Sequence, residues 1–224
     1  ALTKNEDEEL GGETATIALR LYETAVGFGC GSVAVFNNML AAMSKVATLP
    51  HLKKLFPPDM SDPRPDKYTY SIVLRQLKRE PFTEWLPYYN QLIKNSVPID
   101  GPLMTALLLC VRLARPRPPQ DFTVPFMTMI GKKMREEPYS RLTRPSHSLY
   151  MDVLRVHGHY EDVIRHYTHI IKPAMDSRNV DQEILRCLFR STLRLGRGQA
   201  VLAEFERLRT HLDYRASARD MMAI

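Results

Sequence analysis

Basic side chains recur at a similar place in successive segments of the chain. Lys45, Arg79 and Arg194 hold the same place in three segments, and Arg112 and Arg155 come one residue earlier in two others. A row of cations at regular steps can follow the phosphates of a nucleic-acid strand, and such binding weakens as salt is added. We therefore expect these five residues to form a phosphate-binding ladder.

Arg186, Arg190 and Arg194 form a second basic group, at positions i, i+4 and i+8 of one expected helix. Helical geometry places the three side chains within an arc of about 80°. The planar guanidinium of arginine matches phosphate better than an ammonium group does. The alternative is an ordinary solvated surface, or pairing with acids of a neighbouring helix such as Glu204 and Glu206.

Five of the seven histidines lie in one short stretch: His147, His157, His159, His166 and His169. A zinc site needs ligands that converge from two elements, and these positions permit such convergence. No cysteine lies nearby, however, and the repeat described below accounts for every position. We therefore expect surface histidines and no metal.

The sequence lacks the motifs of common catalytic and nucleotide-binding sites. The GFGCG segment at residues 27–31 looks like a phosphate loop, but a helix rather than a strand precedes it. A helix end followed by an inter-repeat turn explains it better. No GKS/T, GxSxG or HExxH motif occurs, and Cys30, Cys110 and Cys187 form no CxxC pair. We therefore expect no enzymatic activity, no cofactor and no disulfide framework.

The elements that would position the basic residues are short helices. Apolar residues recur at helical spacing, and the period-2 alternation of a half-buried strand is nowhere sustained. The expected helices are 14–27, 35–46, 70–77, 103–113, 149–156, 163–171, 184–195 and 200–212. Prolines cluster between them, for example at Pro57-Pro58 and Pro118-Pro119. This pattern indicates an all-α fold of helical hairpins.

The net charge indicates which kind of partner the protein could bind, and the length of the apolar runs bears on whether it could span a membrane. The net charge is +6, although the segment 1–13 contains five acids and only one lysine, Lys4. The rest of the chain is therefore more basic than the total suggests, which favours a polyanionic partner. The longest apolar run, residues 103–111, is about half the length of a membrane-spanning helix, so we expect a soluble protein.

The helices repeat with a period of about 34 residues, which is typical of two-helix repeats. Residues 34–46 align with residues 68–80, and residues 102–114 continue the series at the same offset. One position of the repeat is usually small and polar, and in the five repeats it holds Asn37, Ser71, Thr105, Ser148 and Arg186. Asp66 and Asp100 close the first two repeats, again at this offset. Two-helix repeats of this length are tetratricopeptide or pentatricopeptide repeats.

The residues resemble the pentatricopeptide family. The tetratricopeptide pattern has a tryptophan and an early Leu-Gly in the first helix, whereas Trp85, the only tryptophan, lies in an expected second helix. VFNNML, TYSIVL, the turn glycines Gly158 and Gly196, and LPYYNQLIKNSVPID with its closing P-x-D resemble the pentatricopeptide pattern instead. The resemblance covers residues 14 to about 213 and is weakest between 116 and 145. It implies an α-solenoid, a right-handed superhelix of about five helix-turn-helix hairpins.

The resemblance also divides the chain into segments. These are an acidic extension at 1–13, a half-repeat at 14–31, repeats at about 33–66, 67–100, 101–143, 144–181 and 182–213, and a tail at 214–224. The half-repeat matches the second helix of a hairpin, with Tyr22 at the aromatic position. We therefore expect further repeats or a cap upstream.

Pentatricopeptide proteins bind single-stranded RNA, and each repeat holds roughly one base. The resemblance implies that the small polar residue and the closing aspartate read the base together: Asn37 with Asp66, Ser71 with Asp100, and Ser148 with Asp181. The Asn–Asp pair resembles the uracil-preferring type and the Ser–Asp pair the guanine-preferring type. Arg186 departs from the pattern, and no aspartate closes the repeat of Thr105.

The family is mostly found in mitochondria and plastids. The irregular loops and the Arg- and His-rich segments resemble repeat proteins of unusual mitochondrial ribosomes, such as those of kinetoplastid protists. We expect a mitochondrial matrix protein that binds ribosomal RNA or a transcript and other proteins of a ribonucleoprotein, without a membrane or a small-molecule substrate. The alternatives are a free factor for transcript stability, processing or editing, and a protein-binding scaffold of the tetratricopeptide type.

Overall fold

The computed structural model describes residues 4–45, 49–60, 64–136, 139, 143–176 and 181–212. All secondary structure in these residues is helical, which confirms the predicted all-α class. The chain divides into two compact units, Ala1–Pro118 and Pro119–Ile224, and each is a stack of helices packed in chain order. Among these described helices, none combines the length and the apolar character that a bilayer crossing needs.

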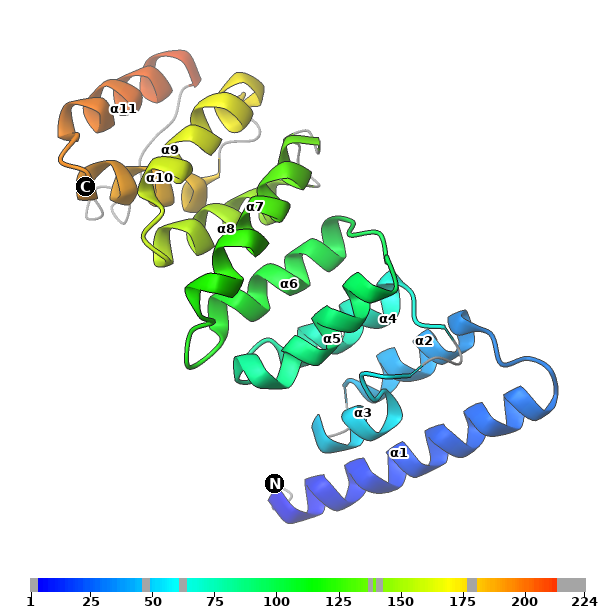
Figure 1. Cartoon of the computed structure of the whole chain (residues 1–224). Coiled ribbons are helices and arrows are strands. Elements are labelled where there is room, and N and C mark those ends of the chain that lie inside the picture. Colours follow the sequence, from blue (N-terminus) through cyan, green and yellow to red (C-terminus); the bar gives the residue numbers. More distant parts are fainter. Residues whose placement is uncertain are drawn as a thin grey trace. The chain divides into compact units, whose positions relative to one another are not determined.

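The first unit is built from α1 (Lys4–Gly27), α2 (Val33–Met43), α3 (Leu49–Leu55), α4 (Lys67–Leu77), α5 (Phe82–Lys94) and α6 (Gly101–Leu113). Each helix packs on the next one along the chain, and α4 also lies beside both α2 and α6 (Figure 1). The helices α2, α4 and α6 are the first helices of three predicted repeats. Within this unit, the first helices therefore form one continuous layer.

The second unit is built from α7 (Gln120–Glu136), α8 (Arg144–Val156), α9 (Tyr160–His166), α10 (Gln182–Arg194) and α11 (Gly198–Leu212). A π-helical turn, Tyr167–Ile171, and a 3-10 turn, Lys172–Ala174, extend α9. The first helices α8 and α10 pack side by side. Tyr150 of α8 closes on α7 at Gly131, where even a β-carbon would overlap the tyrosine hydroxyl.

One position of the repeat is buried in all five first helices. It precedes the small polar position and holds Phe36, Tyr70, Met104, His147 and Leu185, each at most 2% exposed. The register inferred from the sequence thus coincides with a register of core side chains. It also explains why a histidine is fully buried.

Aromatic rings connect the hairpins of the first unit. Phe56, which follows α3, packs against Phe36, Tyr70 and Tyr88 with ring-centroid distances of 6.3, 5.7 and 5.6 Å. The Tyr88 hydroxyl donates a hydrogen bond to the Phe56 carbonyl oxygen at 3.0 Å. Tyr22 of α1 extends the cluster, 5.2 Å from Phe36. Rings from α1, α2, α4 and α5 therefore share one core.

Helix boundaries differ from the expected ones at several places, and most of all at the start of α1. Helix α1 begins at Lys4, so it includes residues 4–13, which the sequence analysis set apart as an acidic extension. Helix α7 occupies the segment where the repeat pattern is weakest. The expected tail at 214–224 lies outside the described residues.

Candidate nucleic-acid interface

The structure brings Asn37 and Asp66 together. Asn37 Nδ2 donates to Asp66 Oδ1 at 3.0 Å, and Asn37 Oδ1 accepts from the Thr69 hydroxyl at 2.7 Å. Asn37 lies on α2 and Asp66 immediately precedes α4, so the contact spans two adjacent first helices. Because Asn37 is only 9% exposed, a base would have to share or replace these hydrogen bonds.

Asp66 also caps helix α4. Its Oδ1 accepts from the backbone N–H groups of Tyr68 at 2.9 Å and Thr69 at 3.0 Å, and the Thr69 hydroxyl accepts from the Asp66 N–H in return. Burial raises the pKa of Asp66, but the hydrogen bonds from Thr69, Asn37 and Tyr68 outweigh burial and hold this pKa below its usual value. The closing aspartate is therefore also a helix cap, a structural role beyond the predicted base contact.

The second predicted pair is arranged differently. The Ser71 hydroxyl donates to the Lys67 carbonyl at 2.8 Å, while Asp100 pairs with the Lys67 ammonium at 2.9 Å. Asp100 also caps α6 by accepting from the Leu103 N–H at 3.1 Å. Ser71 lies on α4 and Asp100 caps the adjacent first helix α6, and each is bonded to Lys67.

Thr105 and Asp181 have local partners. The Thr105 hydroxyl donates to a backbone carbonyl one turn earlier in α6, at 2.9 Å. Ser148 is half-buried on α8. Asp181 caps α10 through two backbone N–H groups and lies 3.7 Å from the Arg144 guanidinium. Asp66, Asp100 and Asp181 are thus all helix caps.

The predicted ladder marks one end of each first helix. Lys45 and Arg79 lie just beyond the C-terminal ends of α2 and α4, and both are exposed. Arg112 and Arg155 occupy the last turns of α6 and α8, and Arg194 is the last residue of α10. A cation at this place interacts favourably with the helix dipole, which gives each position a local reason as well.

Three of the predicted cations line one cavity in the second unit. Arg155 of α8, Arg190 and Arg194 of α10, Tyr160 of α9 and Leu193 surround about 430 Å³, and we call this cavity the basic hollow. Arg190 and Arg194 are exposed, and no ion pair or hydrogen bond joins their side chains to the part of the chain that the structure describes. Their charges therefore remain available to a ligand.

Arg155 and Arg186 each form an ion pair with an acidic residue of their own helix. Arg155 donates to Asp152 from Nε at 3.1 Å and from Nη2 at 2.5 Å, which orients its guanidinium. Arg186 pairs with Glu183 and is not among the residues lining the basic hollow. Tyr160 is not among the predicted site residues, and its one signal in the sequence is an aromatic residue at the start of a second helix.

The prediction of surface histidines is wrong for two of the five. His147 Nδ1 lies 2.9 Å from His166 Nε2, and the two residues are 0% and 8% exposed. Burial, together with His147 and Arg135 nearby, lowers the pKa of His166 to about 3, so this ring is neutral. His147 is buried because it occupies the core position of its repeat. Within the described ranges, no group of three or more His, Cys, Asp or Glu side chains is placed to hold a metal ion.

Compared with known proteins, the sequence matches no protein-family model and no curated protein. Each unit has its own candidate contacts for nucleic acid: the Asn37–Asp66 contact and the cations at the ends of α2, α4 and α6 in the first unit, and the basic hollow in the second.

Proposed function

We propose that the protein is a non-enzymatic helical-repeat protein that binds single-stranded RNA. The observation that carries the proposal is the basic hollow. Arg190 and Arg194 offer guanidinium groups to a phosphate, and Arg155 is already oriented beside them. Tyr160 supplies an aromatic ring, and aromatic rings stack on bases of any type.

Two further features favour a strand over an isolated anion. The first helices lie side by side within each unit, so side chains on them can meet successive nucleotides. The Asn37–Asp66 contact joins two such helices and offers amide and carboxylate groups at one place.

The setting of this activity follows from the resemblance to pentatricopeptide proteins. We propose that the protein works in the mitochondrial matrix, as a structural or assembly component of a mitochondrial ribosome or related ribonucleoprotein. A free factor for RNA stability, processing or editing and a protein-binding scaffold are the rival functions.

Fluorescence anisotropy with a 20-nucleotide single-stranded RNA, measured from 50 to 300 mM salt, tests the proposal. We expect the logarithm of the affinity to fall with the logarithm of the salt concentration, with a slope of about −2 to −4 for three to five phosphate contacts. A blunt RNA duplex of the same length is the control and should bind more weakly.

The same titration separates the rivals. A free processing factor should bind one short sequence far more tightly than a scrambled one, whereas a ribosomal component should bind both weakly and co-sediment with ribosomes. The absence of RNA binding at 50 mM salt would contradict the proposal. The protein-binding scaffold would then be the remaining candidate function.

A further inference from the structure

The basic hollow is lined by positive charge. Among the residues that the structure describes, no acid lines this cavity, and three of its lining residues are arginines. Glu161 follows the lining residue Tyr160 in the chain, but both of its carboxylate oxygens accept from the Arg197 guanidinium, at 3.0 and 2.6 Å. The charge of Glu161 is therefore neutralised by a residue outside the lining. An anion in the basic hollow would meet cations without a carboxylate on the same wall.

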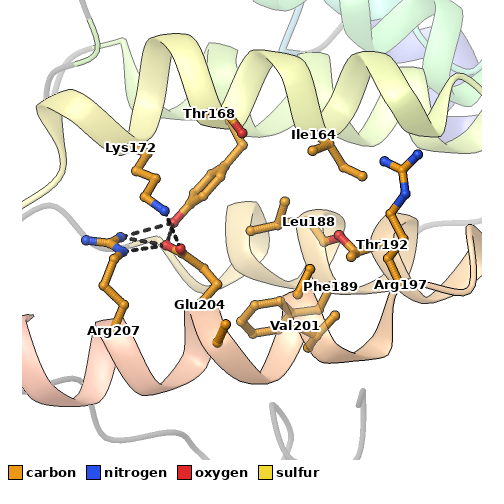
Figure 2. A pocket seen from close by; sticks show the side chains of 13 residues that line it. Ile164, Thr168, Lys172, Leu188, Phe189, Thr192, Arg197, Val201, Glu204 and Arg207 are labelled. Carbon is orange, nitrogen blue, oxygen red and sulfur yellow. Dashed lines mark hydrogen bonds and ion pairs between the residues drawn. The ribbon is translucent and has the colours of Figure 1, made fainter.

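A second cavity of this unit differs in this respect. It has a volume of about 380 Å³, lies between α9, α10 and α11, and contains the carboxylate of Glu204 (Figure 2). Glu204 accepts hydrogen bonds from the Tyr167 hydroxyl, the Lys172 ammonium and the Arg207 guanidinium, each at 2.6 Å. Burial raises the pKa of Glu204, but these bonds outweigh burial and hold this pKa below its usual value, so the group is ionised at neutral pH. An anion in that cavity would meet this negative charge.

Two positive charges at the basic hollow have no acid beside them in the described part of the chain. Arg155 is bonded to Asp152 through Nε and Nη2, so these two residues together add no net charge. Arg190 and Arg194 are exposed, and neither forms an ion pair with a described residue. They are one turn apart on α10, about 6 Å along the helix axis, and both line the same cavity. Their guanidinium groups can therefore contact one ligand together.

The basic hollow lies where α8 and α10 end and α9 begins. The segments of this unit outside the described residues connect to the other ends of these helices. Residues 140–142 precede the start of α8, residues 177–180 precede the start of α10, and residues 213–224 follow the end of α11. In α8 and in α10, about 18 Å of helical rise separates the first residue from the last. Those connections are therefore remote from the basic hollow along the helices.

We propose that the basic hollow binds the phosphate monoester at one end of an RNA strand, an inference that rests on the proposed RNA-binding function. A phosphate inside a strand is a diester with one negative charge, whereas a monoester carries about −1.5 to −2 at pH 7 and matches the charges of Arg190 and Arg194. A monoester also offers three acceptor oxygens to the two guanidinium groups. The cavity volume of about 430 Å³ suits one nucleotide, with its base against Tyr160.

Competition binding to the full chain tests the proposal. A fluorescent 20-nucleotide RNA is displaced by unlabelled strands of one sequence that carry a 5′-phosphate, a 3′-phosphate or only hydroxyl ends. We expect a phosphorylated strand to compete about tenfold better than the hydroxyl strand, because it adds charge-assisted hydrogen bonds. The end whose phosphate gives the larger gain is the end that the basic hollow holds. Equal competition by the three strands would overturn the proposal and leave the RNA-binding function intact, whereas no binding of the fluorescent RNA would contradict both.

Two variants and a mononucleotide complete the test. Arg190→Ala/Arg194→Ala should bind the phosphorylated and the hydroxyl strand equally, whereas Arg165→Ala/Arg209→Ala, which removes the same charge outside the lining, should keep the gain. Uridine monophosphate should need a concentration at least about tenfold higher than the phosphorylated strand, because it lacks the stacking of further bases. Displacement by uridine monophosphate at the concentration of that strand would assign the basic hollow to a free nucleotide. That result, or a gain that survives in Arg190→Ala/Arg194→Ala, would overturn the proposal.

Discussion

Replacing Arg190 and Arg194 together by alanine should weaken the binding of single-stranded RNA at least about tenfold and reduce the salt slope by about 1.4, since each phosphate contact contributes about 0.7. Both guanidinium groups line the basic hollow, and neither makes an ion pair with the described part of the protein. The substitutions therefore remove ligand contacts without breaking internal ones. Anisotropy titrations at four salt concentrations measure both quantities.

The control for this prediction removes the same charge from other places in the same unit. Arg165 and Arg209 are exposed, and neither lines the basic hollow. The Arg165→Ala/Arg209→Ala variant should keep most of the affinity. If the two double variants lose equal affinity, general charge rather than the basic hollow attracts the RNA.

Phe56→Ala should lower the free energy of unfolding by about 3 to 5 kcal/mol, the usual cost of deleting a buried aromatic side chain. Phe56 is fully buried and touches the rings of Phe36, Tyr70 and Tyr88, which come from three helices. Its removal leaves a cavity where the hairpins of the first unit meet. Urea denaturation followed by circular dichroism measures the loss.

The same substitution at an exposed phenylalanine is the control. Phe28 is 81% exposed after the end of α1, so Phe28→Ala should change the free energy of unfolding by no more than about 0.5 kcal/mol. Similar losses in the two variants would show that the aromatic cluster does not hold the hairpins together.

The hairpins could be predicted because the same residue types recur with the period of the repeat. Gly158 and Gly196 have φ values of +83° and +72°, a conformation that glycine adopts at little cost, so the turns are visible in the sequence. The short helix α3 was not predicted, because so short a segment spans too few turns to show a period. The start of α4 was placed late, at residue 70 rather than Lys67, because the apolar pattern does not cover its capped first turn.

Only the part of the candidate site that lies on a single helix could be predicted from the sequence. Arg190 and Arg194 share a face by spacing alone, and the structure places both at the basic hollow. The partners of the other charges depend on packing between helices. Glu204, which was considered a partner for the arginines of α10, instead bonds to Tyr167 and Lys172 in the turns that extend α9.

The central claim is that RNA lies along the first helices, and photocrosslinking tests it most directly. A 20-nucleotide RNA carrying 4-thiouridine is bound to the full chain and irradiated, and the crosslinked peptides are identified by mass spectrometry. We predict crosslinks in peptides of α2, α4, α6, α8 and α10 and at Tyr160. Crosslinks confined to the second helices α3, α5, α7 and α11 would contradict the account.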